Sequence, residues 1–176
     1  MLLIHMLVVC MWCIFVFVVL FAGTGVSTMG TGLHAGCRDS AVTYFAFGFD
    51  DLSGPIQAVN TWVHHCGVAD YNLAAGTTSR KLYLNSIVSA SDISAGPFIG
   101  TGALMWGKAV GFPAAGGIDE FRLYKAALTA SEVQQIYNNQ CFNSIALAIY
   151  YRFDNRMDGK MLIDESGNGR HARIMT

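Results

Sequence analysis

The stretch that decides the fold is GGIDEFRLYKAALTASEVQQIYN, residues 116–138, in which a period of two gives way to a helical period. From Ile118 to Tyr124 apolar and polar side chains alternate, which predicts a strand with one partly apolar face. Thr129 and Glu132 then have the spacing of a capping box, in which each side chain accepts a hydrogen bond from the other residue's backbone N–H. The stretch therefore predicts a strand, a tight turn and one short helix.

Upstream of this stretch, short β-like segments are separated by turn signals. Aromatic and β-branched residues fill Ala41–Phe49, and a turn cluster follows at residues 50–55. Trp62–Ala69 and Lys81–Leu84 are further strand candidates, and Asn85 suits a hairpin turn because asparagine tolerates positive φ. Short strands at frequent turns predict an all-β, two-sheet antiparallel sandwich or jelly roll with one short C-terminal helix.

The chain opens with a long apolar block, and its first lysine or arginine is Arg38. Because about 20 apolar residues can cross a bilayer as a helix, we predict an N-terminal hydrophobic helix over residues 1–24. A linker rich in Gly, Ser and Thr is predicted over residues 25–40. Three interpretations fit the block: a cleaved secretory signal, an uncleaved membrane anchor, or non-native sequence from a misplaced start. The first two place the rest of the chain outside the cytosol, secreted or at the cell surface.

Charge and cysteine content narrow the functional classes. The net charge of −1 gives no electrostatic reason to expect nucleic acid or an anionic membrane as a partner. Cys10 and Cys13 have a Cys-x-x-Cys spacing, but no βαβ pattern surrounds them, so redox chemistry is not indicated. Cys37, Cys66 and Cys141 permit at most one disulfide, which an oxidising compartment would allow. We favour the alternative that Cys66 is a small buried residue of a strand.

Residues 116–138 resemble the closing segment of laminin-G-like, concanavalin A-like jelly-roll domains, which end in a Gly-x-Ile-Asp-Glu strand and a capped helix. Trp62 with the His64-His65 pair, and then residues 80–85, are similar to the family's Trp-His-His strand and Leu-Tyr-Val-Asn-Gly hairpin. The resemblance implies a laminin-G-like sandwich over residues 41–140. It is an incomplete sandwich, since the family's opening strands are missing from its start.

The C-terminal residues resemble the beginning of the same domain type. Tyr150–Asp154 and residues 163–169 are similar to its opening Tyr-x-Phe-Asp strand and Asp-x-Ser-Gly-Asn turn. Residues 146–176 are therefore predicted to be the first strands of a second copy, in a fragment of a larger repeat protein. In the resembling fold the opening strand lies beside the closing strand, so the resemblance implies that Ala146–Phe153 can pair with the otherwise bare edge of Ile118–Tyr124. The alternative is that the segment is only the start of the next copy and does not pair within this chain.

The resemblance implies an extracellular binding or adhesion module that recognises a glycan or a protein, and not an enzyme. Two alternatives stay open: an accessory lectin-like domain of a glycosidase or sialidase encoded outside this chain, or a structural spacer repeat. A stacking platform for sugar rings would need exposed aromatic side chains. The candidates for it are Trp106, Tyr71 and Tyr83.

Calcium is the candidate cofactor, because oxygen-rich turns suit this hard cation. We favour the alternative that residues 164–169 form only a tight turn, because no ligand spacing as specific as that of an EF-hand is present. Its candidate ligands in the second copy are Asp154, Asp164 and Asn168, and in the first copy Asp50, Asp51 and Asp119.

No catalytic residue is predicted. Adjacent residues of a strand point to opposite faces, so neither Asp119 with Glu120 nor His64 with His65 can converge on one site. The neighbouring Asp50-Asp51 pair belongs to a turn cluster. The two histidines are expected to be structural.

Overall fold

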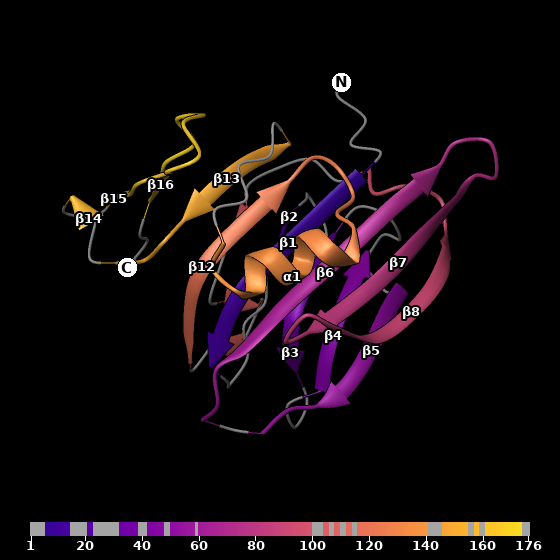
Figure 1. Cartoon of the computed structure of the whole chain (residues 1–176), viewed down its shortest axis with the longest axis horizontal. Helices are drawn as coiled ribbons and strands as arrows, with labels where there is room; N and C mark the ends of the chain where they lie inside the picture. The colour runs from indigo at the N-terminus through magenta and orange to yellow at the C-terminus, as the bar shows by residue number, and fades with distance from the viewer. Residues whose placement is uncertain are drawn as a thin grey trace.

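The structure is a computed structural model of the whole chain. It describes residues 6–14, 21–22, 32–38, 42–47, 50–58, 60–99, 104–105, 108–109, 112–113, 116–140, 146–154, 157–158 and 161–173. The described residues form mainly antiparallel β-strands with one helix (Figure 1).

Two sheets make up the fold, and every strand pair in them is antiparallel. The six-stranded sheet has the order β13 (Leu147–Tyr151), β12 (Gly117–Tyr124), β1 (Met6–Ile14), β6 (Val63–Asn72), β7 (Thr77–Leu84) and β8 (Ile87–Ala95). The five-stranded sheet has the order β5 (Asp50–Ile56), β4 (Val42–Phe47), β3 (Leu33–Arg38), β2 (Phe21–Ala22) and β9 (Leu104–Met105). This arrangement confirms the predicted two-sheet sandwich.

Short strands complete the described elements. A pair consists of β10 (Lys108–Ala109) and β11 (Phe112–Pro113). A small sheet near the C-terminus consists of β14 (Met157–Asp158), β15 (Met161–Leu162) and β16 (Ala172–Arg173).

The helix α1 (Ala130–Tyr137) forms where the capping box predicts it. Thr129 Oγ1 accepts from the backbone N–H of Glu132 at 3.3 Å, and the Glu132 carboxylate accepts from the backbone N–H of Thr129 at 2.6 Å. Val133 and Ile136 are buried, so α1 covers the outer face of the six-stranded sheet (Figure 1).

Apolar side chains are buried on both faces of the six-stranded sheet. The larger cluster fills the space between the two sheets and includes Phe45, Leu82 and Phe121. The second cluster lies between the sheet and α1 and includes Val8 and Tyr124. Strands β1, β6, β7 and β12 contribute side chains to both clusters, as strands covered on both faces do.

The N-terminal hydrophobic helix that composition predicts is not formed over Met6–Ile14, which is strand β1. β1 lies in the middle of the six-stranded sheet, paired with β12 on one side and β6 on the other. A short apolar run fits a buried strand as well as a helix, and here two neighbouring strands supply its hydrogen bonds. Within the part of the chain that the structure describes, no helix is long and apolar enough to cross a membrane.

The range 25–40 is likewise more than a linker. Strand β3 lies within it and pairs with β4 from Leu33↔Phe47 to Arg38↔Val42. Leu33, Ala35 and Cys37 are buried in the core between the sheets, which explains why a segment of small and polar composition is ordered.

The disulfide joins Cys10 of β1 to Cys66 of β6, which lie opposite each other in the strand register. The expectation that Cys66 is an unbonded buried thiol is therefore wrong, because its partner lies in the apolar block. Cys13 and Cys37 are free and buried, and Cys141 lies outside the described residues.

The predicted pairing of the C-terminal segment is confirmed. β13 lies along the edge of β12, with Phe121 opposite Tyr151 and Leu123 opposite Ile149. The segment therefore closes the six-stranded sheet of this chain. That residues 146–176 also begin a second domain stays a prediction.

Candidate functional site

A β-bulge in β12 shapes the candidate site. Cys10 lies opposite Arg122 and Trp12 lies opposite Asp119. Between these two pairs β12 therefore contains one residue more than β1. Glu120 lies at the bulge and has a φ of 52°. This is the left-handed region of backbone conformation, which is unfavourable for residues that have a Cβ atom. Bulges redirect side chains, and strained residues of this kind recur at functional sites.

Glu120 is the centre of a charged cluster shared by β12 and β13. Its Oε2 accepts a hydrogen bond from the Tyr150 hydroxyl at 2.7 Å and also pairs with Arg122. Its Oε1 lies 3.5 Å from Nε of Arg152, whose Nη2 is 2.7 Å from the carboxylate of Asp154. The cluster thus alternates positive and negative groups along one surface.

Tyr150 is held by the same cluster. Arg122 donates to its hydroxyl at 3.0 Å, and the Arg122 guanidinium carbon lies 4.4 Å from the ring centroid. Burial, together with the hydrogen bond to Glu120, raises the pKa of Tyr150 to about 12. The phenol therefore stays a neutral hydrogen-bond donor at physiological pH.

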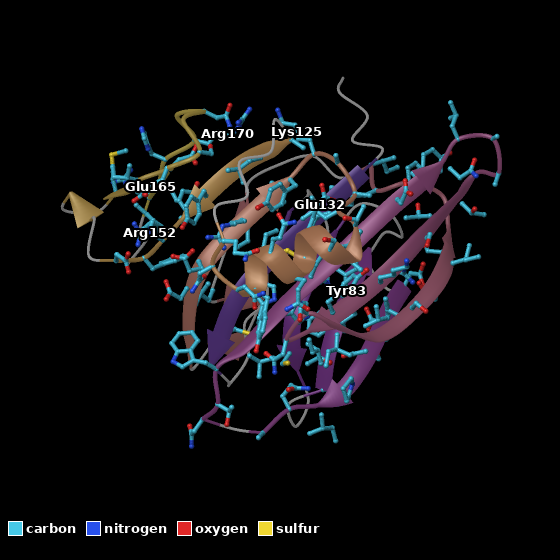
Figure 2. All side chains as sticks on the ribbon, in the orientation of Figure 1. Tyr83, Lys125, Glu132, Arg152, Glu165 and Arg170 are labelled. Carbon is cyan, nitrogen blue, oxygen red and sulfur yellow. A yellow bond between two sulfur atoms is a disulfide. The ribbon has the colours of Figure 1, made fainter. Side chains whose placement is uncertain are left out.

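A cavity of about 630 Å³ opens between this cluster and α1. Its lining is mostly polar, with two aliphatic side chains: Glu120, Arg122, Ile136, Asn139, Gln140, Leu147, Tyr150, Arg152, Glu165 and Ser166. Figure 2 shows Arg152 and Glu165 near each other on the β13 side of the molecule. The cavity is large enough for a small polar ligand such as a sugar unit.

The predicted aromatic platform is not assembled among the described residues. Tyr83 is only 2 % exposed and packs in the cluster between the sheet and α1 (Figure 2), so its ring is covered by protein. Tyr71 is partly exposed on β6, opposite Thr78 of β7. Trp106 lies outside the described residues.

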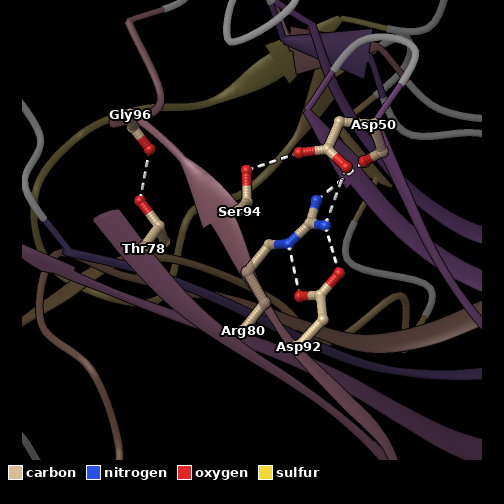
Figure 3. Close-up of polar contacts among 6 residues, drawn as sticks. All are labelled: Asp50, Thr78, Arg80, Asp92, Ser94 and Gly96. Atoms are coloured by element: carbon tan, nitrogen blue, oxygen red, sulfur yellow. Dashed lines mark hydrogen bonds and ion pairs between the residues drawn. The ribbon is translucent and has the colours of Figure 1, made fainter. Parts of the chain in front are cut away.

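Asp50, a predicted calcium ligand, is engaged with a buried arginine instead (Figure 3). Arg80 of β7 is fully buried and donates from Nη2 to Oδ1 of Asp50 at 3.1 Å and from Nε to Asp92 at 2.9 Å. Ser94 donates to the other oxygen of Asp50. These contacts tie β5 to β7 and β8 and leave Asp50 occupied by protein donors.

The other first-copy candidates, Asp51 and Asp119, lie on β5 and β12. Asp51 pairs in register with Ala46 of β4. Asp119 accepts from the backbone N–H of Glu120 at 2.9 Å, and burial raises the pKa of its carboxyl group.

Asp164, in the second-copy group, organises a turn. Its carboxylate accepts from the backbone N–H groups of Tyr150, Ser166 and Arg170 at 3.0, 3.0 and 2.9 Å. Although desolvation by burial opposes it, this hydrogen bonding lowers the pKa of Asp164. The residue therefore acts as an ionised acceptor that fixes the turn.

Asn168 lies within that turn, and Asp154 follows the end of β13. Asn168 Nδ2 donates to the carbonyl oxygen of Leu147 at 3.0 Å, while Asp154 is exposed and paired with Arg152. Among the residues that the structure describes, no three His, Cys, Asp or Glu side chains are grouped to hold a metal ion. Calcium binding stays a prediction.

The two histidines point to opposite faces of β6, as the strand alternation predicts. His64 lies edge-on to Tyr137 of α1, with ring centroids 5.7 Å apart. His65 donates from Nε2 to the carbonyl oxygen of Tyr44 at 3.1 Å, in the core between the sheets. Both are almost fully buried, which fits a structural role.

From the sequence, Glu120 was considered only together with Asp119, and Arg122, Tyr150 and Arg152 were not among the candidate site residues. The predicted pairing of the two strands could have identified Arg122 and Tyr150. It places Arg122 opposite Tyr150, so their side chains share one face.

Two antiparallel sheets in a sandwich, closed by a capped helix, define the concanavalin A-like class of jelly-roll proteins. A laminin G family model described as "Concanavalin A-like lectin/glucanases superfamily" matches residues 23–134, and the chain belongs to this family. Comparison with curated proteins finds no match.

Solved structures share the fold at low identity. One is a candidate carbohydrate-binding protein from Bacteroides ovatus, with 19 % identity, a TM-score of 0.70, and coverage of 98 % of this chain and 55 % of that chain. Another is the heptameric SAP-like pentraxin of Limulus polyphemus, with 13 % identity, a TM-score of 0.59, and coverage of 97 % and 83 %. This chain thus spans little more than half the length of the Bacteroides protein.

Proposed function

We propose that this chain is a recognition module that binds a glycan in the cavity between β12, β13 and α1. The observation that carries the proposal is the charged cluster around Glu120, which a strained β-bulge holds in position before any ligand arrives. Preorganised polar groups beside a cavity favour binding, because little conformational freedom is lost when the ligand enters. The likeness to a candidate carbohydrate-binding protein supports the same class of ligand.

The arrangement of charges favours an uncharged sugar. The charged side chains that line the cavity are two carboxylates, Glu120 and Glu165, and two guanidinium groups, Arg122 and Arg152. These charges cancel, so the lining offers no net positive charge to attract an anionic ligand. A sugar hydroxyl both donates and accepts, so neighbouring hydroxyls match neighbouring carboxylate and guanidinium groups.

We propose binding without hydrolysis. Glycoside hydrolysis needs two carboxyl groups free to act on either side of a glycosidic bond. Both oxygens of Glu120 already lie against donors from Tyr150 and the two arginines. Glu120 is therefore better suited to orient a ligand than to transfer a proton.

An extracellular location is part of the proposal. The Cys10–Cys66 disulfide supports it, because such bonds persist in oxidising compartments. A protein ligand, or an accessory role beside a glycosidase or sialidase, would use the same cavity. A spacer repeat would use no cavity at all, and the following experiment separates it from the others.

The test is a glycan array followed by titration calorimetry with the best neutral oligosaccharide. Arg122→Gln and Tyr150→Phe remove cluster groups while preserving most of the side-chain volume. Each should weaken binding by about 10-fold or more, since a hydrogen bond to a charged group contributes about 1.5–3 kcal/mol. Lys81→Gln, on an exposed position of β7 outside the cavity, is the matched control. Equal affinity of all three variants, or no neutral glycan bound, would contradict the proposal.

A further inference from the structure

Trp62, which directly precedes β6, is a large aromatic side chain that lies partly in solvent. It is 44 % exposed, and it is the one aromatic residue among the large apolar side chains that are exposed in the part of the chain that the structure describes. A tryptophan ring offers a large rigid surface for contact with a ligand. The exposed part of this indole is therefore available for binding.

The indole is held against a glycine of β12. A Cβ atom at Gly117 would lie 3.0 Å from Cη2 and 3.5 Å from Cζ2 of Trp62, so the tip of the six-membered ring occupies the space that a larger side chain would need. Because β1 lies between β6 and β12, the side chain of Trp62 reaches across β1 (Figure 1). Contact with the Gly117 backbone thus fixes one end of the ring while another part stays open to solvent.

The indole and the cavity lie on the same face of the six-stranded sheet. Ile118 packs toward the core between the sheets, and successive residues of a strand point to opposite faces, so a Cβ at Gly117 would point to the outer face. Trp62 lies where that Cβ would be and is therefore on the outer face. Arg122 of the cavity is on this face as well, because its neighbours in β12 pack inward.

The surface between the indole and the cavity is short and polar. Gly117 and Glu120 are three residues apart in β12, which corresponds to about 10 Å of extended strand. Asp119 lies between them. Burial raises the pKa of its carboxyl group most, and the nearby charges of Glu120 and Asp154 raise this pKa further. The charged cluster thus extends from the cavity almost to the glycine beneath the indole.

We propose that Trp62 is a second sugar subsite, and that the ligand is a neutral oligosaccharide that extends along β12 from the cavity to the indole. This inference rests on the proposed function, since the cavity holds one end of the sugar chain. A sugar ring presents C–H groups on its faces and hydroxyl groups at its rim. The C–H groups stack on the negative π face of the indole, and the hydroxyl groups bond to carboxylates such as those of Asp119 and Glu120.

The surroundings of Trp62 favour a sugar over a protein surface. Tryptophan anchors of protein interfaces lie at the centre of well-packed pockets from which water is excluded. Here Asp119 and Glu120 follow Gly117 on the side of the cavity, and the neighbouring Thr61 is exposed. A ligand with apolar faces and a polar rim matches an aromatic ring in such polar surroundings.

The test compares sugars of increasing length. Neutral gluco-, manno- and galacto-oligosaccharides of one to six units are titrated into the full chain by calorimetry. In a series that binds, the longest members should bind about tenfold more tightly than the monosaccharide, as expected for one added aromatic contact. Trp62→Ala should remove this gain and leave the affinity for the monosaccharide unchanged. Trp62→Phe keeps an aromatic ring and should retain part of the gain.

The matched control is Ile93→Ala, at an exposed apolar position of β8, and it should keep the full gain. A second readout uses the unsubstituted chain and does not depend on how well Trp62→Ala folds. The indole N–H resonance of Trp62, identified by its absence in Trp62→Phe, should shift when the longest bound oligosaccharide is added but not when the monosaccharide is added. An unshifted resonance, or an equal gain in the parent and in Trp62→Ala, overturns the second subsite.

Failure of this inference and failure of the proposed function give different results. Tyr150→Phe should weaken binding at every chain length, whereas Trp62→Ala should weaken only the binding of long chains. Binding that depends on Tyr150 but not on Trp62 overturns the second subsite alone. Binding that depends on Trp62 but not on Tyr150 contradicts the cavity as the glycan site, and with it the path along β12. The absence of any bound neutral sugar overturns both proposals.

Discussion

Acidification from pH 7.5 to pH 5 should destabilise this protein through its two buried histidines. Burial, with smaller contributions from neighbouring charges, lowers the pKa of His64 from 6.5 to about 3, and burial lowers that of His65 from 6.5 to about 4. In the unfolded chain both titrate near 6.5. At a pH between the folded-state and unfolded-state pKa values, the histidines are protonated in the unfolded state but not in the folded state. The free energy of unfolding therefore decreases as the pH falls.

The magnitude follows from the two pKa values of each histidine. At pH 5, a group with a pKa of 6.5 when unfolded and about 3 to 4 when folded disfavours folding by about 2 kcal/mol. Two such groups remove about 4 kcal/mol, a large part of the stability of a typical domain. The loss begins below pH 6.5 and levels off near pH 3 to 4, where the folded-state histidines also become protonated. Asp164, whose pKa is lowered from 3.8, adds its own loss only at more acidic pH.

Urea unfolding at pH 7.5, 6.0 and 5.0 measures this loss. His65→Gln keeps an N–H that can reach the carbonyl oxygen of Tyr44 but cannot be protonated in this range. It should remove about half of the pH dependence, because one of the two buried imidazoles is then absent. Leu73→Gln, at an exposed position with no titratable group, should leave the pH dependence unchanged. A parent protein equally stable at pH 7.5 and pH 5.0, or an identical pH slope in the two variants, would refute the reasoning.

Three further predictions concern the fold and the cluster. Replacing Cys10 and Cys66 together by Ala should destabilise the protein by about 4 kcal/mol by the chain-entropy estimate for a separation of 56 residues, measured by urea unfolding; an unchanged midpoint would argue against the bridge. Asp92→Ala removes an ion-pair partner of the fully buried Arg80 and should cost about 1–3 kcal/mol, less than a fully buried pair because Asp92 is partly exposed; thermal unfolding checks this. Glu120→Gly relieves the positive φ and should retain or raise the melting temperature while abolishing glycan binding, and a loss of both would show that the carboxylate is structural.

The sequence allowed the closing strand and helix to be predicted because their signals are local. The alternation from Ile118 to Tyr124 and the Thr129–Glu132 capping box each depend on residues that lie within one element. The pairing of Ala146–Phe153 with that strand was one of two alternatives at the level of sequence, suggested by the strand order of the resembling family, and the structure shows that the pair forms. That pairing brings Leu147 and Tyr150 to the cavity.

The middle strand and the disulfide were decided by tertiary structure alone. Met6–Ile14 is apolar and has no clear hydrophobic period. Such a sequence is equally compatible with a membrane helix and with a strand that is covered on both faces. The choice depends on β6 and β12, which lie far away in the sequence and supply the backbone partners on either side. Cys10 meets Cys66 only through that placement.

The alternation of residues, the turns and the helix cap thus determined the class of fold from the sequence by itself. The candidate site required the three-dimensional arrangement. Glu120 contacts Tyr150 and Arg152 because a bulge opposite β1 adds one residue to β12. No local sequence pattern indicates the position of that extra residue. Hydrogen bonds between strands distant in sequence set the register, and the register sets which side chains meet.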